Sequence, residues 1–200
     1  MEACQQGDLA GVQRDYDPEM GRDLLMCACR HGHLAIVTWL FEQGVDCRAE
    51  DDGALVLACQ AGHLAVVEYL CSLGADVHAH LDSPMIYAVN SMRLDLIQFL
   101  HTQGADLSLH SYFPFQKACT WGNLELAQWT YANTQEIIPA EVLGHALQIS
   151  LFGEHVEMIQ WLLTLNPPED VVLASRGTSD EIDDLIYWHL QRSRAKNAPQ

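Results

Sequence analysis

Basic residues are scarce in this 200-residue chain. Ten Lys and Arg residues stand against 27 Asp and Glu residues, which gives a formal net charge of −17. Between His31 and Ser175 the only Lys or Arg residues are Arg48, Arg93 and Lys117. So negative a surface repels phosphate backbones and anionic lipid headgroups, which argues against nucleic-acid and membrane binding. The acidity either serves solubility alone or attracts a partner protein with a basic patch.

Long apolar runs and a complete set of disulfide partners are also missing. No apolar run approaches the roughly 18 residues that a membrane span needs. The first residues, MEACQQGDLAG, lack the charged and apolar regions of a signal peptide. The seven Cys residues are an odd number, which argues against a closed disulfide framework. We therefore expect a reduced, cytoplasmic protein, and the 49% of hydrophobic residues allows a substantial core.

Motifs for catalysis and cofactor binding are absent from the sequence. It contains no G-x-S-x-G, H-E-x-x-H, P-loop or G-x-G-x-x-G pattern. Cys27 and Cys29 lie close to His31 but form no four-ligand metal spacing. Adjacent acids such as Asp51 and Asp52 are expected to be solvated. We expect no enzyme activity, no cofactor and no metal; catalysis on an unusual scaffold would need a pocket with converging polar groups.

The chain does contain an internal repeat. GHLAIVTWLFEQGVD begins at Gly32, and GHLAVVEYLCSLGAD begins 30 residues later at Gly62. Weaker copies contain the sequences YAVNSMR, KACTWGN and QISLFGE, and a shortened copy, EACQQGDLAGVQR, opens the chain. The sequence thus holds one partial and five full units. Each full unit has the apolar spacing of two short helices, which can bury their apolar faces only by stacking on neighbouring units.

Glycine marks the turn between the two helices of a unit. Gly32, Gly62, Gly122 and Gly153 fit the left-handed residue that ends a helix, and Met92 replaces the glycine in the third copy. The His residues of the two GHL motifs, His33 and His63, begin second helices and are expected to serve structure. The residues His80 and His110 lie in connections between units, where we expect them to be exposed.

The segment ACQAGHLAVVEYLCSLGADV, which begins at Ala58, resembles the ankyrin repeat. The resemblance covers roughly residues 1–165 and implies an all-α, ankyrin-type helical solenoid that binds another protein. The T-P-L-H opening of the family is absent, and the period is 30 rather than about 33 residues. This short period is similar to repeats of amoeba-associated giant viruses and of intracellular bacteria. It also predicts short turns at residues 76–83 and 106–113 in place of β-hairpin fingers.

We expect a single ankyrin-like domain over residues 1–190. Its predicted parts are a partial unit or cap at 1–21, five repeats at 22–51, 52–81, 82–111, 112–142 and 143–171, and a capping helix at 172–192. The capping helix includes SDEIDDLIYWHLQR, whose acidic start and basic end suit the helix dipole. Residues 193–200 are expected to form a flexible tail.

Two sets of residues recur once per unit and are expected to pack rather than to bind. The aromatic column lies in the second helices and consists of Trp39, Tyr69, Phe99, Trp129 and Trp161. The small-residue column lies late in the first helices and consists of Cys4, Cys29, Cys59, Val89, Cys119 and Ser150.

The two residues before each internal glycine lie at the helix–helix turn, which borders the concave face in ankyrin-like stacks. The predicted protein-binding residues are Arg30, His31, Gln60, Asn90, Ser91, Thr120, Trp121, Leu151 and Phe152. Early copies are polar or small here, whereas later copies present Trp121 and Phe152 as candidate anchors. The alternative is that both aromatics fold back into the less regular C-terminal half.

These patterns predict a monomeric protein-binding module without catalytic activity. Its partner would be a protein, favoured if it carries a basic patch. The viral and bacterial likeness extends the expected location to the host cytoplasm, with a role as an effector on host proteins. The alternative is an acidic decoy or inhibitor that occupies a basic site on a nucleic-acid-binding protein, which strong salt dependence of binding would favour.

Overall fold

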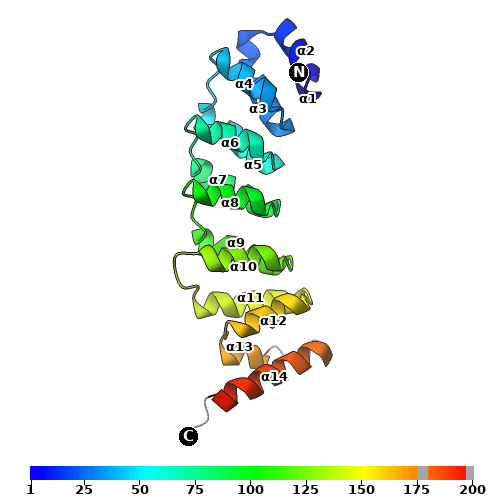
Figure 1. Ribbon diagram of the computed structural model, residues 1–200, viewed down its shortest axis with the longest axis vertical. Helices are drawn as coiled ribbons and strands as arrows, with labels where there is room; N and C mark the ends of the chain where they lie inside the picture. Colours follow the sequence, from blue (N-terminus) through cyan, green and yellow to red (C-terminus); the bar gives the residue numbers. More distant parts are fainter. Residues whose placement is uncertain (175–179, 197–200) are drawn as a thin grey trace. The chain divides into compact units, whose positions relative to one another are not determined.

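The computed structural model describes the backbone of residues 1–174 and 180–196, and the side chains of 1–174 and 182–191. Throughout these ranges the regular structure is helical and no strand is present (Figure 1). This confirms the predicted all-α class. It also confirms that the connections at 76–83 and 106–113 contain no two-stranded fingers. The chain forms two compact units, Met1–Asp106 and Leu107–Gln200, and the assignment of residues 1–190 to one domain stays a prediction.

The first compact unit begins with a shortened helix pair and continues with three full pairs. The shortened pair is α1 (Glu2–Gln5) and α2 (Leu9–Arg14), followed by the 3-10 helix η1 (Pro18–Met20). The full pairs are α3 (Gly21–His31) with α4 (Leu34–Glu42), α5 (Ala49–Ala61) with α6 (Leu64–Ser72), and α7 (Ala79–Asn90) with α8 (Leu94–Thr102). First helices pack on first helices, and second helices pack on second helices.

The second compact unit holds two helix pairs and two terminal helices. The pairs are α9 (Leu109–Thr120) with α10 (Leu124–Asn133), and α11 (Ala140–Phe152) with α12 (Val156–Thr164). Helix α13 (Glu169–Ala174) packs on α11, and α14 (Asp180–Lys196) packs on α12 and α13. The described residues of the predicted capping helix, 172–192, belong to α13, which begins at Glu169, and to α14.

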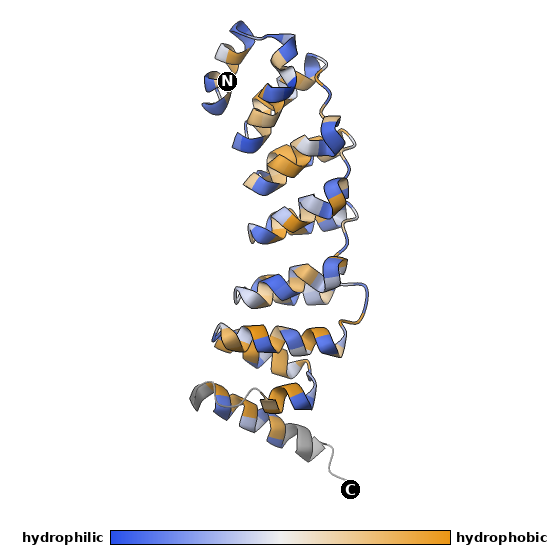
Figure 2. Cartoon of the chain, turned by 180° about the vertical axis from the view of Figure 1, so that it is seen from behind, coloured by the Kyte–Doolittle hydropathy of each residue, from blue (hydrophilic) through white to orange (hydrophobic). Residues whose placement is uncertain are grey.

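The core of both units follows the predicted small-residue column. Cys4, Cys29, Cys59, Val89, Cys119 and Ser150 are all 0% exposed. Each helix combines hydrophobic and hydrophilic residues (Figure 2), because only the face that packs on a neighbour leaves water. In the aromatic column, Trp39 packs edge-to-face on Tyr16 with ring centroids 4.9 Å apart, and Trp161 packs on Tyr131 at 5.8 Å.

A left-handed helical turn lies at the start of three first helices. Residues 50–52 in α5, 80–82 in α7 and 110–112 in α9 all have φ between 47° and 64°. Each turn is closed by a backbone hydrogen bond across four residues, such as Asp52 N–H to Arg48 O at 3.2 Å. Left-handed helix costs roughly 1–2 kcal/mol per non-glycine residue. Other interactions must therefore stabilise these turns.

Side chains of one connection hold the backbone of the next in the first unit. Asp52 is buried, lies 3.5 Å from Arg48 Nε, and accepts a hydrogen bond from Asp76 N–H at 3.1 Å. Asp51 accepts a hydrogen bond from His80 N–H at 2.9 Å. The expectation that Asp51 and Asp52 are solvated is wrong for Asp52, which is buried, whereas Asp51 is exposed as expected but also binds the following connection.

The predicted left-handed turn glycine is found in three of its four places. Gly32 and Gly62 have φ of 76°, and Gly122 has φ of 66°. Gly153 was expected to be left-handed as well, but it has φ of −84° and Glu154 is left-handed instead, with φ of 53°. The motif of this copy is displaced by one residue, so the strained position falls after the glycine.

Histidines at the start of second helices connect successive helix pairs. The Nε2–H groups of His33, His63 and His155 donate hydrogen bonds of 3.0–3.1 Å to turn carbonyls of the preceding pair. A Cβ atom at Gly32 would lie 2.5 Å from His63 Nδ1, so glycine leaves room for the imidazole ring. These contacts confirm the predicted structural role of His33 and His63.

Candidate protein-binding surface

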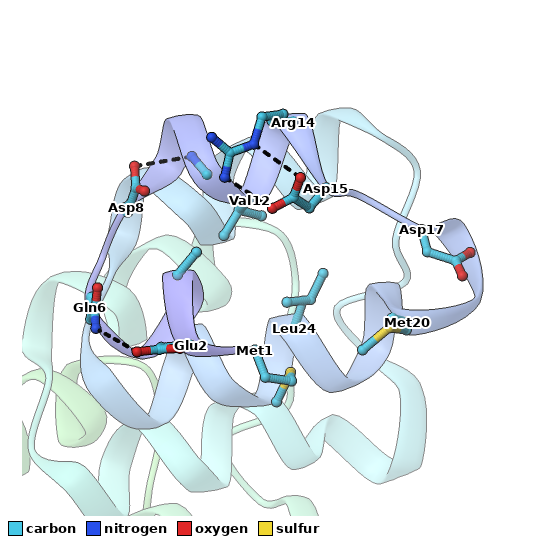
Figure 3. A pocket seen from close by; sticks show the side chains of 12 residues that line it. Met1, Glu2, Gln6, Asp8, Val12, Arg14, Asp15, Asp17, Met20 and Leu24 are labelled. Carbon is cyan, nitrogen blue, oxygen red and sulfur yellow. Dashed lines mark hydrogen bonds and ion pairs between the residues drawn. The ribbon is translucent and has the colours of Figure 1, made fainter.

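A hollow of about 360 Å³ lies beside α1, α2 and the start of α3, lined by apolar and acidic side chains (Figure 3). Its polar groups already have internal partners. Gln6 donates to Glu2 at 3.3 Å, Asp8 accepts from Gly11 N–H, and Asp15 pairs with Arg14 at 3.0 Å. Because these groups are engaged with one another, the hollow does not present the converging free polar groups that the enzyme hypothesis needs.

Buried thiols account for most of the cysteine residues. Burial raises the pKa of the Cys4, Cys29 and Cys119 thiols to about 12, and it raises the pKa of Cys59 as well. A thiol is nucleophilic only as the thiolate, so these side chains are inert near neutral pH. Among the described side chains, those of residues 1–174 and 182–191, no three or more His, Cys, Asp or Glu residues form a group that could hold a metal ion.

This burial predicts the outcome of thiol titration. With a disulfide-exchange reagent at pH 8, the folded protein should release far less chromophore than its seven thiols would give, because buried thiols are both neutral and inaccessible. Protein unfolded in guanidinium should react completely at once. Rapid reaction of the folded protein at Cys29, Cys59 and Cys119, identified by mass spectrometry, would contradict the buried positions.

The predicted binding residues lie at the ends of first helices, and all but one are exposed. In the first unit, the exposed side chains at the ends of α3, α5 and α7 are Arg30, His31, Gln60, Asn90 and Ser91. In the second unit, Thr120, Trp121 and Phe152 lie exposed at the ends of α9 and α11. Leu151 is only 5% exposed. Its side chain belongs to the core, so it is removed from the candidate surface.

Trp121 and Phe152 are large aromatic side chains that face solvent. Trp121 is 64% exposed and follows the last residue of α9, whereas Phe152 is 95% exposed and ends α11. The alternative that they fold back into the core does not hold, because Phe115 and Leu147 fill the core of these helices.

Hydrogen bonds fix the ends of α9 and α11 against each other. His155 Nε2–H donates to Thr120 O at 3.0 Å. The buried Ser150 Oγ, which donates to Ala146 O at 2.8 Å within α11, also lies 3.4 Å from Cys119 O of α9. Packed helices have axes about 8–10 Å apart. Phe152 is the last residue of α11 and Trp121 directly follows the last residue of α9, so the two aromatics lie at the same end of neighbouring helices, where one partner segment could reach both.

The side chains that α9 and the last turns of α11 present near the two aromatics are polar but not acidic, and the nearest acid in sequence is Glu154, in the turn after Phe152. Lys117 lies on the same face as Trp121, with its Nζ 5.7 Å from the indole ring. His145 of α11 contacts Gln116 of α9 at 2.7 Å, and Gln148 is exposed one turn before Phe152. Helix α9 contains no Asp or Glu. Sequence analysis missed this local neutrality because the net charge of the whole chain obscured it, although LHSYFPFQKACT displays it directly.

Comparison with known proteins agrees with the helix pairs described above. Residues 1–81 match the family described as ankyrin repeats (3 copies). The human ASB11 ankyrin repeat domain is 22% identical, with 82% of each chain covered and a TM-score of 0.64. An ankyrin repeat domain from Acinetobacter baumannii AYE is 21% identical, with 82% of this chain and 96% of that chain covered and a TM-score of 0.64.

The similarity to these two solved structures shows the fold. The match to the family model assigns residues 1–81 to ankyrin repeats. No curated protein matches the chain. Within residues 1–174 and 180–196, no helix is long and apolar enough to cross a membrane. Ankyrin repeats typically mediate protein–protein interactions. Residues 1–81 therefore match the ankyrin repeat family in sequence, and the stacked helix pairs share the fold of ankyrin repeat domains.

Proposed function

We propose that the protein binds a partner protein through an anchor surface on α9 and α11, formed by Gln116, Lys117, Thr120, Trp121, His145, Gln148 and Phe152. The observation that carries this proposal is the exposure of two large aromatic side chains, Trp121 and Phe152, at adjacent turn positions. The same positions in earlier copies hold polar or small residues, so packing of the repeat does not require an aromatic there.

The composition of the anchor surface suits an interface. Aromatic side chains surrounded by polar groups dominate the energy of many protein–protein contacts, because a partner removes them from water while the polar rim forms hydrogen bonds. The ends of α9 and α11 are held in place by His155 and Ser150. A surface fixed in this way loses little conformational entropy when the partner binds.

The exposed turn residues of the first unit stay predicted contacts of the same kind. They are Arg30, His31, Gln60, Asn90 and Ser91. The net charge of −17 favours a partner with a basic patch, since opposite charge speeds the approach of two proteins. A role as a viral or bacterial effector on host proteins rests on the likeness of the 30-residue period alone.

Substitution of the anchors should weaken partner binding without loss of stability. Affinity capture from lysate and mass spectrometry would identify the partner, and titration calorimetry would measure its affinity. Trp121→Ala and Phe152→Ala should each weaken binding by about 30-fold, equivalent to about 2 kcal/mol. Their melting temperatures should equal that of the parent, because both side chains are exposed.

A matched control is available on α14. Trp188 is 61% exposed, close to the value for Trp121, but lies outside the anchor surface. Trp188→Ala should bind the partner like the parent. If Trp121→Ala and Phe152→Ala also bind like the parent while Arg30→Ala and Gln60→Ala weaken binding, the site lies in the first unit and the proposal fails.

An acidic decoy for a basic nucleic-acid site is the second candidate, and the net charge of −17 is the observation that favours it. The ankyrin repeat family is generally non-catalytic, so both candidates are binding functions. A decoy would lose affinity steeply with added salt and would compete with nucleic acid for its partner. Binding through the aromatic anchors would change much less with salt, because apolar contact is not screened.

A further inference from the structure

We infer that the anchor surface recognises a carboxylate. The partner would be a peptide segment that presents an Asp or Glu side chain to Lys117 and apolar side chains to Trp121 and Phe152. This inference rests on the proposed function of the same surface and specifies the chemistry of the partner there.

Lys117 is an isolated cation in an acidic chain. No other Lys or Arg occurs between Arg93 and Arg176. Within residues 1–174, most of the Arg side chains contact a carboxylate of the chain itself at 2.8–3.5 Å: Arg14, Arg22, Arg48 and Arg93. No carboxylate of the described side chains lies within 4 Å of the Lys117 ammonium.

The surroundings of Lys117 leave its ammonium to a partner. Helix α9 has no acid, and α11 has only Glu141, in its first turn and 11 residues before Phe152. Glu154 follows Phe152 in the turn but forms no ion pair with Lys117. The chain has 27 acids, yet none among the described side chains pairs with Lys117, which lies beside the exposed Trp121. Such a lysine can bind an external anion.

The indole ring and the lysine form one recognition element. Lys117 is half-buried, and its Nζ lies 5.7 Å from the ring centroid of Trp121. The ring restricts the ammonium through a cation–π contact. A partner that covers Trp121 also removes water from the ammonium, which strengthens the attraction to a carboxylate. The exposed amide of Gln148 can then bind the backbone of the segment.

This short-range chemistry is compatible with long-range attraction of a basic protein. The net charge acts before contact, over about 10 Å or less at moderate salt. Lys117 acts only after contact, at a single position. A partner with basic flanks and one acidic residue among apolar ones satisfies both.

The test begins with a random-peptide phage library selected on the full-length protein. Binders that also bind the Trp121→Ala/Phe152→Ala double variant are removed. The remaining peptides should be enriched in Asp or Glu next to aromatic or aliphatic residues. Synthetic versions are then titrated by fluorescence anisotropy against the parent, Lys117→Met and Lys117→Arg, all checked for equal melting temperature.

Lys117→Met should weaken the peptides about tenfold, since a hydrogen bond to a charged group contributes about 1.5 kcal/mol or more. Lys117→Arg should retain most of the affinity. Replacing the acidic residue of the peptide by its amide should weaken binding to the parent by the same factor of about ten. It should not weaken binding to Lys117→Met any further.

The outcomes separate this inference from the proposed function. If the selected peptides depend on Trp121 and Phe152 but bind Lys117→Met like the parent, carboxylate recognition is overturned and the anchor surface stands. If no peptide distinguishes the double variant from the parent, both proposals are overturned.

Discussion

Gly32→Ala should lower the free energy of unfolding by about 3 kcal/mol, although it adds only one methyl group. Left-handed backbone at φ of 76° costs an alanine roughly 1–2 kcal/mol. The new Cβ would also lie 2.5 Å from His63 Nδ1. The ring must then move and give up its hydrogen bond to Arg30 O, which adds about 1–2 kcal/mol. Urea unfolding followed by circular dichroism measures the sum.

Gly44 provides the matched control. It has φ of 85°, but no atom lies within 4 Å of a Cβ built there. Gly44→Ala should therefore lower the free energy of unfolding only by the cost of left-handed backbone at an alanine, roughly 1–2 kcal/mol. Combining Gly32→Ala with His63→Ala should reveal non-additivity, since the clash disappears with the ring. Equal losses for Gly32→Ala and Gly44→Ala would mean that His63 does not couple the two helix pairs.

Trp39→Ala should destabilise the first unit by about 3 kcal/mol. This value is at the lower end of the range for truncation of a buried tryptophan to alanine. The indole is half-buried in α4 and packs edge-to-face on Tyr16, which follows α2. Its loss removes a contact between the shortened first pair and the first full pair. In a repeat protein such damage stays near the altered unit. Hydrogen exchange should therefore accelerate in α2–α4 while α9–α12 keep their protection.

Trp188→Ala serves as the stability control for this substitution as well. The same truncation at a mostly exposed site should change the melting temperature by little. If Trp39→Ala melts like the parent, the aromatic column does not stabilise the stack. Uniform acceleration of exchange along the chain would instead contradict the local character of the damage.

The sequence allowed the helix pairs and the buried column to be predicted because a repeat encodes register directly. Cys29, Cys59 and Cys119 fall at the same place in their copies, and each is fully buried. The same reasoning failed at Gly153, where the copy is displaced by one residue and Glu154 takes the left-handed backbone. The predicted start of the capping helix at 172 was also too late, since α13 begins at Glu169, directly after a proline, and proline is well tolerated at the start of a helix.

The left-handed turns could not be predicted from local sequence. Residues 50–52, 80–82 and 110–112 read Glu-Asp-Asp, His-Leu-Asp and His-Ser-Tyr, which have no residue type common to all three and contain no glycine. Propensity argues against left-handed backbone at such residues. In the first unit, tertiary contacts such as that of Asp51 with His80 outweigh propensity. Such contacts are visible only when neighbouring connections are placed in space.

The sequence predicted where the candidate site lies along the chain, but not which of its side chains face solvent. Departure from the repeat template identified the residue pairs at the end of each first helix. One residue separates Leu151, which is buried, from Phe152, which is almost fully exposed. Successive side chains of a helix point about 100° apart. Because the fifth copy is displaced by one residue, its sequence did not predict which of Leu151 and Phe152 is exposed. The structure resolves this and adds Lys117, whose significance depends on the absence of acids around it.

Binding at the anchor surface is tested most directly by photocrosslinking. A photoreactive phenylalanine analogue would replace Phe152 in the full-length protein, and, as a control, Phe41, which is also exposed but lies in the first unit. Irradiation with the captured partner should give a crosslinked adduct from position 152 and none from position 41. An adduct from position 41 with none from position 152 would contradict binding at the anchor surface.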